Sequence, residues 1–124
     1  VIAIEESSSA IKDASCNVSD LDNLTLMRGK VEQALLNLDR IPDVVILDPP
    51  RSGCHQSVLE SLDNLSPGRV AYVSCDPNTM CRDLDQLIKL GFFIQSLQPI
   101  DLFPHTLHVE CIAFLTRETG RIIG

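Results

Sequence analysis

The segment from Val70 to Leu84, VAYVSCDPNTMCRDL, contains a cysteine at a place where a side chain can do chemistry. Residues 70–73 predict a short buried strand, and the Asp-Pro-Asn-Thr run at 76–79 predicts the start of a helix. Cys75 therefore lies on the turn between them, where the N–H groups and dipole of the helix favour a thiolate nucleophile. Free cysteines are often simply buried, so a packing role is an equally good interpretation of this segment alone.

Two acidic residues follow predicted strands elsewhere in the chain. Asp48 follows the predicted buried strand 43–47 and precedes two prolines that hold the next loop rigid. An acid there can bind a ligand N–H or hydroxyl, or it can merely cap a turn. Glu5 ends the first predicted strand and is of the type that bonds ribose hydroxyls in nucleotide-binding sheets, although exposed glutamates without such a role are common.

The segment FPHTLHVE, residues 103–110, gathers two histidines and a glutamate before an apolar strand. His105, His108 and Glu110 suggest a metal site, but their spacing lacks helical periodicity and no fourth ligand is marked, so we expect no metal. A glutamate that enters an apolar strand is costly unless it has a partner or a task. A buried general base is therefore the more specific interpretation of Glu110.

The alternation of apolar and polar segments predicts an α/β fold. Strands are expected at 1–4, 24–27, 43–47, 69–74, 92–97 and 109–116, and helices at 8–17, 31–38, 57–65 and between 76 and 91. In the last helix, Met80, Leu84, Leu87 and Ile88 are expected to form one buried face. Strands that alternate with helices form a mostly parallel sheet, with the last two strands as an antiparallel hairpin.

Composition sets limits on the class of protein. With 124 residues, 44% of them hydrophobic, one domain is expected, and no apolar run approaches the roughly 20 residues of a membrane span. The five cysteines include no C-x-x-C pair, which argues against disulfides and zinc and favours a reducing cytoplasm. A net charge of −7 is unfavourable for binding phosphates, so an RNA partner would need basic surface elsewhere in a longer protein.

Taken together, DPPRSG, YVSCDPNTMCRDL and FPHTLHVE resemble the RNA uracil-5-methyltransferase family, S-adenosyl-L-methionine-dependent enzymes that act on tRNA and 23S rRNA. The resemblance implies a Rossmann-like class I methyltransferase, a three-layer sandwich, of which residues 1–124 form part of the catalytic domain. It makes Cys75 the nucleophile and Glu110 the general base. Its implied methyl-donor contacts are Glu5 and Asp48, and its candidate substrate contacts are Arg51 and His105.

The chemistry of the family explains these residue types. Carbon 5 of uracil is a poor nucleophile, so a thiolate first adds to carbon 6, and a base later removes the proton from carbon 5 so that the thiol can leave. Reaching the ring requires a base turned out of its stack, so the expected substrate is an RNA loop or an unstacked base.

The sequence begins as though cut inside a strand, and the family's first strand and glycine-rich loop are expected to be missing. We therefore expect a fragment that is inactive alone, binds S-adenosyl-L-methionine weakly or not at all, and closes its open sheet edge by pairing differently or as a homodimer. Two other interpretations stay open: a methyltransferase that acts on another acceptor without the cysteine, and a non-catalytic RNA-binding or interaction domain.

Overall fold

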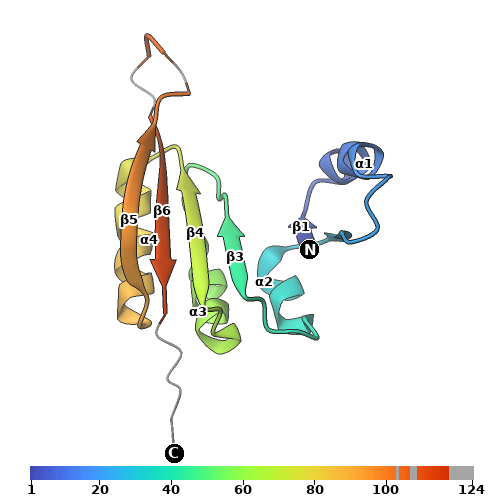
Figure 1. Ribbon diagram of the computed structural model, residues 1–124, viewed down its shortest axis with the longest axis horizontal. Coiled ribbons are helices and arrows are strands. Elements are labelled where there is room, and N and C mark those ends of the chain that lie inside the picture. Colours follow the sequence, from blue (N-terminus) through green and yellow to red (C-terminus); the bar gives the residue numbers. More distant parts are fainter. Residues whose placement is uncertain (103, 107–108, 118–124) are drawn as a thin grey trace, which may run out of the picture. The chain divides into compact units, whose positions relative to one another are not determined.

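The computed structural model describes residues 1–102, 104–106 and 109–117 (Figure 1). The chain divides into two compact units, one from Val1 to Asp39 and the other from Arg40 onward. Each unit has its own sheet, and no strand pairing in the described part of the chain joins the two sheets. Within those residues, no helix is long and apolar enough to cross a membrane.

The first unit is a pair of strands with two short helices. Its elements are β1 (Ile2–Glu5), α1 (Ser8–Asn17), β2 (Thr25–Arg28), α2 (Val31–Ala34) and the 3-10 turn η1 (Leu35–Asn37). The two strands run parallel, as strands joined through a helix do. The predicted start of the first helix is confirmed, because the Ser7 hydroxyl oxygen accepts a hydrogen bond of 3.4 Å from the N–H of Ala10.

The second unit is a four-stranded mixed sheet with two helices. Its elements are β3 (Val44–Leu47), α3 (Gln56–Leu65), β4 (Arg69–Ser74), α4 (Pro77–Lys89), β5 (Phe93–Ile100) and β6 (Glu110–Thr116). The strand order is β3-β4-β6-β5, in which β3 and β4 are parallel while β6 is antiparallel to both of its neighbours. The predicted antiparallel hairpin at the end of the chain is therefore confirmed.

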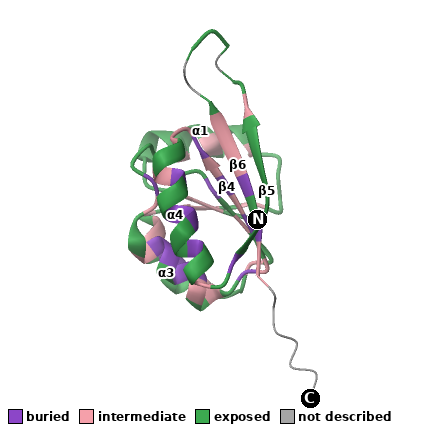
Figure 2. Ribbon diagram, turned by 90° about the vertical axis from the view of Figure 1, so that its left-hand side faces the viewer, coloured by how far each residue is buried: buried purple, intermediate pink, exposed green. Residues whose placement is uncertain are grey.

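Both helices of the second unit lie on the same face of its sheet (Figure 2). Tyr72 and Leu87 are completely buried, and they belong to the core between the sheet and the helices. The strand register places Ile46 and Phe114 on the opposite face, where they are 72% and 42% exposed. The hydrophobic core of this unit therefore lies on the helix-bearing face.

Two predicted elements differ from the observed ones. The expected helix at 31–38 has only one α-helical turn before it tightens to a 3-10 turn, because Lys30 provides no side-chain cap and Pro42 soon follows. The expected strand at 92–97 instead continues to Ile100, through Pro99. A proline is tolerated there because β5 is an end strand of the sheet, where no partner on its outer side needs the missing N–H.

The buried face of α4 also differs from the prediction. Met80, Leu84 and Leu87 are buried as expected, but Ile88 is 49% exposed and Asp83 is buried instead. A stripe through residues 80, 83, 84 and 87 still has helical spacing, so the helix is turned slightly from the expected orientation. The apolar periodicity identified the helix, and a carboxylate occupies part of its core-facing side.

Candidate active site

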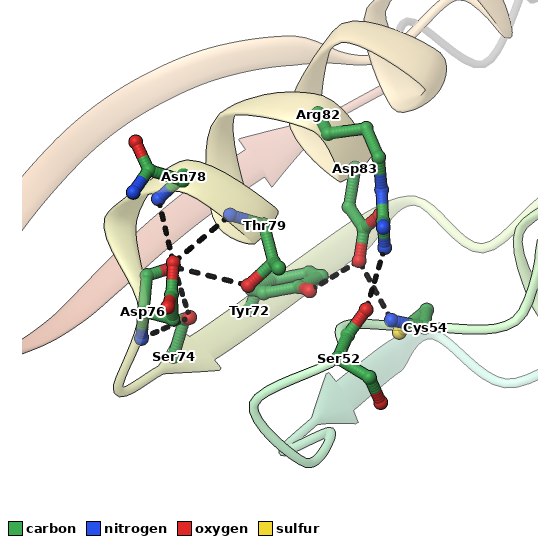
Figure 3. A network of polar contacts seen from close by, with 9 residues as sticks. All are labelled: Ser52, Cys54, Tyr72, Ser74, Asp76, Asn78, Thr79, Arg82 and Asp83. Carbon is green, nitrogen blue, oxygen red and sulfur yellow. Dashed lines mark hydrogen bonds and ion pairs between the residues drawn. The ribbon is translucent and has the colours of Figure 1, made fainter.

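Cys75 lies on the turn between β4 and α4, as the sequence predicted. The turn is fixed by the Ser74 hydroxyl, which accepts a hydrogen bond from the Asp76 N–H at 3.0 Å and donates one to the Asp76 carbonyl at 2.9 Å. The Asp76 carboxylate caps the helix by accepting from the N–H groups of Asn78 and Thr79, at 2.9 and 3.1 Å (Figure 3). A partly exposed thiol is thus held on a well-determined turn at the start of a helix.

The strand register brings Glu110 to the same end of the sheet as Cys75. The pairing of β4 with β6 reaches Ser74 and Cys111. One residue further, Cys75 follows Ser74 on one strand and Glu110 precedes Cys111 on the other, as neighbours do in an antiparallel ladder. Glu110 begins β6 opposite Ile100 and is only partly buried, because it stands at the end of its strand rather than inside the sheet.

Asp48 is the first residue after β3, and its side chain is exposed. Since β3 and β4 are parallel, Asp48 and Cys75 both lie beyond the carboxyl ends of their strands, the edge at which such sheets bind ligands. Arg51 is exposed in the loop that follows. That loop turns back through a hydrogen bond of 2.8 Å from the Gly53 N–H to the Pro50 carbonyl.

Glu5 ends β1, as predicted, and therefore belongs to the first unit. Its carboxylate accepts a hydrogen bond of 2.6 Å from the N–H of Ser7, the residue that caps α1. Glu5 thus helps to form the turn into the helix. The other candidates, Cys75, Asp48 and Glu110, all belong to the second unit.

The loop between β5 and β6 carries the remaining candidates. His105 is exposed and has a left-handed backbone with φ of +67°. Phe103, Leu107 and His108 lie outside the described residues, and so does any metal site that would use His108. Within the described part, no three histidine, cysteine, aspartate or glutamate side chains gather as a metal site would require.

A buried carboxylate that the sequence alone did not single out lies on α4. Asp83 is 1% exposed, and it accepts hydrogen bonds from the Tyr72 hydroxyl at 2.5 Å and from the Cys54 N–H at 2.7 Å. It also accepts two from Arg82, from Nε at 2.9 Å and from Nη2 at 2.8 Å. The sequence feature that could have indicated this network is an acidic residue at an apolar position of the helical repeat. Burying such a charge is costly unless hydrogen-bond donors pair it fully.

This carboxylate changes the protonation of its neighbours. Burial, followed by the charge of Asp83, raises the pKa of the Cys54 thiol to about 11. Burial and the hydrogen bond donated to Asp83 also raise the pKa of Tyr72. Cys54 is therefore a protonated thiol at neutral pH, which makes it a poor nucleophile.

The arrangement of strands and helices is that of Rossmann-like methyltransferases. The crystal structure of a Pyrococcus abyssi tRNA (uracil-54, C5)-methyltransferase with S-adenosyl-L-homocysteine matches 94% of this chain, with a TM-score of 0.79 and 32% identity, over 28% of that chain. An rRNA methylase from Streptococcus thermophilus also matches 94% of this chain, with a TM-score of 0.71 and 18% identity, over 72% of that chain. The second likeness shows the fold alone.

The sequence comparisons define the family. A family model described as tRNA (uracil-5-)-methyltransferase matches residues 1–118. A Bacillus cereus protein named as an RNA methyltransferase is 40% identical over 121 residues, which are 93% of this chain and 26% of that protein. The chain belongs to the tRNA (uracil-5-)-methyltransferase family, as its three motifs indicated, and it spans about a quarter of the length of such curated relatives.

Proposed function

We propose that this chain is part of the catalytic domain of an enzyme that methylates carbon 5 of a uridine in RNA, with Cys75 as nucleophile and Glu110 as general base. The observation that carries the proposal is the register of β4 and β6, which brings both residues to one end of the sheet. A cysteine on a capped turn and a carboxylate on the adjacent strand are the two groups that this reaction needs. Membership of the family supports the same assignment.

Each of the two residues has a defined chemical task. The Cys75 sulfur bonds to carbon 6 of uracil, and the electron pair of the ring's double bond moves to the oxygen on carbon 4, which activates carbon 5. Carbon 5 then takes the methyl group as the methyl–sulfur bond of the donor breaks and its electron pair stays on the donor sulfur. Glu110 afterwards removes the proton from carbon 5. The double bond then forms again, and the Cys75 sulfur leaves with its electron pair.

We assign binding of the methyl donor to carboxylates at the ends of parallel strands. Asp48 follows β3 and Glu5 ends β1, and carboxylates at such positions suit the hydroxyls and the amino group of a nucleoside donor. S-adenosyl-L-methionine supplies an electrophilic methyl group when it is bound. Asp48 and Glu5 fit the role of holding it, although Glu5 also accepts the bond from Ser7.

Arg51 and His105 are the proposed contacts to the RNA. Both are exposed, and both lie in loops that follow strands of the second unit. The net charge of −7 means that these residues alone cannot neutralise an RNA backbone, so the longer protein must supply most of the phosphate contacts.

Trapping the covalent intermediate tests the proposal. The full-length protein is incubated with S-adenosyl-L-methionine and with tRNA or rRNA in which uridine is replaced by 5-fluorouridine. Fluorine on carbon 5 cannot leave as a proton, so the cysteine stays attached and the complex survives denaturing electrophoresis. Peptide mass spectrometry then locates the adduct, which we expect at Cys75.

Cys81 provides a matched control, because it is an exposed cysteine on α4, the helix that begins just after the Cys75 turn. We expect Cys81→Ala to form the adduct and Cys75→Ala to form none. Methyl transfer that survives in Cys75→Ala would instead favour a methyltransferase acting on another acceptor. No adduct and no methyl transfer with either RNA would favour a non-catalytic RNA-binding domain.

A further inference from the structure

Asp83 joins three separate parts of the second unit through one buried carboxylate. It lies on α4, the helix that begins at the Cys75 turn, and receives hydrogen bonds from Tyr72 on β4 and from the Cys54 N–H. Cys54 lies near the end of the loop between β3 and α3, which begins at Asp48. The carboxylate thus connects the loop of the proposed methyl-donor contact to the helix of the proposed nucleophile.

Arg82 adds a second connection to the same loop. Its Nη2 atom donates both to Asp83, at 2.8 Å, and to the Ser52 carbonyl, at 2.8 Å. The Arg82 side chain is 54% exposed, whereas that of Asp83 is 2% exposed, so the buried carboxylate is the fixed centre of the network. The Ser52 carbonyl and the Cys54 N–H, on either side of one loop residue, are therefore hydrogen-bonded to two adjacent residues of the helix.

The residue between those two backbone groups allows this close approach. Gly53 has φ of +79°, a conformation that side-chain-bearing residues rarely adopt. A Cβ atom at Gly53 would lie 2.5 Å from Oδ2 of Asp83 and would also collide with Nη2 of Arg82. The glycine is needed because the loop backbone lies directly against the ion pair.

We propose that Asp83 is a positioning residue, which holds the loop from Asp48 to Cys54 in a fixed place relative to Cys75. The inference rests on the proposed function, because it concerns how that site is held together. Pairing of β3 with β4 fixes only the start of the loop, and Asp83 with Arg82 fixes its far end. Without the carboxylate, the strands can stay paired while the loop that carries Asp48 and Arg51 moves.

The first measurement tests the contact itself, independently of the reaction. Hydrogen–deuterium exchange of the full-length protein, read by peptide mass spectrometry, compares residues 50–54 with the strand β4. In Asp83→Asn we expect at least tenfold faster exchange in the loop and little change in the strand. Unchanged loop exchange in Asp83→Asn would overturn the inference even if the protein proves to be an active methyltransferase.

The second measurement tests positioning through steady-state kinetics of methyl transfer to RNA. We expect Asp83→Asn and Gly53→Ala each to lower kcat/KM at least tenfold and to raise the KM for S-adenosyl-L-methionine, at a temperature where circular dichroism shows folded protein. Asp85→Asn is the matched control, since it makes the same change at an exposed carboxylate of the same helix, and it should keep wild-type kinetics.

Tyr72→Phe distinguishes the positioning role of Asp83 from a purely structural one. Tyr72→Phe removes a bond to Asp83 but leaves both contacts to the loop, so it should lower Tm while kcat/KM stays within threefold of wild type. If Tyr72→Phe loses as much activity as Asp83→Asn, or if Asp83→Asn stays within twofold of wild type, the positioning role is wrong. If wild-type protein methylates no RNA, the proposed function fails, and the exchange experiment still decides whether the loop is held.

Discussion

Alkaline pH should destabilise the second unit through the Cys54 thiol. Burial and the charge of Asp83 raise the pKa of this thiol from 9.0 to about 11 in the folded chain. Below pH 9 the thiol is protonated in both the folded and the unfolded chain, so its contribution to stability is fully present. Between pH 9 and about 11 only the unfolded chain loses the proton, and the free energy of unfolding falls as the pH rises.

The size of the effect follows from that pKa difference. One pKa unit corresponds to about 1.4 kcal/mol, so the loss approaches about 2 to 3 kcal/mol once the pH passes the folded value. Cys54 is partly exposed, and solvent screening brings the expected loss toward about 2 kcal/mol. Cys54→Ala removes the thiol but keeps the backbone N–H that donates to Asp83, so the difference between the two proteins measures the contribution of the thiol, including its effect on Tyr72.

Urea unfolding of the full-length protein and of Cys54→Ala, in a reducing buffer, measures this difference. Curves are recorded at several pH values from below 9 to above 11, the range that the thiol spans. We expect wild type to lose about 2 kcal/mol more than the variant over that range, because only wild type has the buried thiol. Equal losses in the two proteins would refute the reasoning.

Glu110→Gln should leave uracil attached to Cys75, because the proton on carbon 5 stays in place. A shifted protein band on denaturing electrophoresis with ordinary RNA would reveal the adduct, whereas turnover near the wild-type rate would remove Glu110 from the mechanism. Tyr72→Phe should cost about 1.5 to 3 kcal/mol, since it removes a hydrogen bond to a buried charge, and an unchanged urea midpoint would contradict this. Residues 1–124 alone should bind S-adenosyl-L-methionine weakly or not at all, since they span only about a quarter of the length of the curated relatives; tight binding in calorimetry would disprove this prediction. The same piece should close its open sheet edge by pairing differently or by dimerising, and a monomer by light scattering with an ordinary sheet order would count against both.

The sequence predicted those features that depend on neighbouring residues. Strand β4 was predicted with its observed bounds, because a short apolar run is followed directly by helix-starting residues. The turn at Cys75 followed from the same run, since Asp76 caps the helix with its own carboxylate. The prediction for residues 31–38 was less accurate, because its apolar periodicity gave no measure of how weakly Lys30 caps the helix.

The spatial relation between Cys75 and Glu110 could not be predicted from any local sequence pattern. Cys75 and Glu110 were paired in the sequence analysis only through resemblance to a family, and their positions at one end of the sheet depend on which strand lies beside β4. The register of β4 with β6 supplies that relation, because it pairs Ser74 with Cys111. Strand order in a sheet is decided by packing over the whole unit, so sequence spacing could not give it.

Asp83 shows what the apolar repeat of a helix can predict and what it cannot. It lies between Met80 and Leu87 on the buried side of α4, where the apolar repeat alone would exclude a charge. A buried carboxylate is stable only where donors surround it, so the position itself predicts a network, but not the members of that network. The donors come from β4, from α4 and from the loop after β3, which only the folded chain brings together. A charged residue within an apolar helical stripe is therefore a reason to look for a loop that the helix holds, and here that loop begins at a proposed contact to the methyl donor.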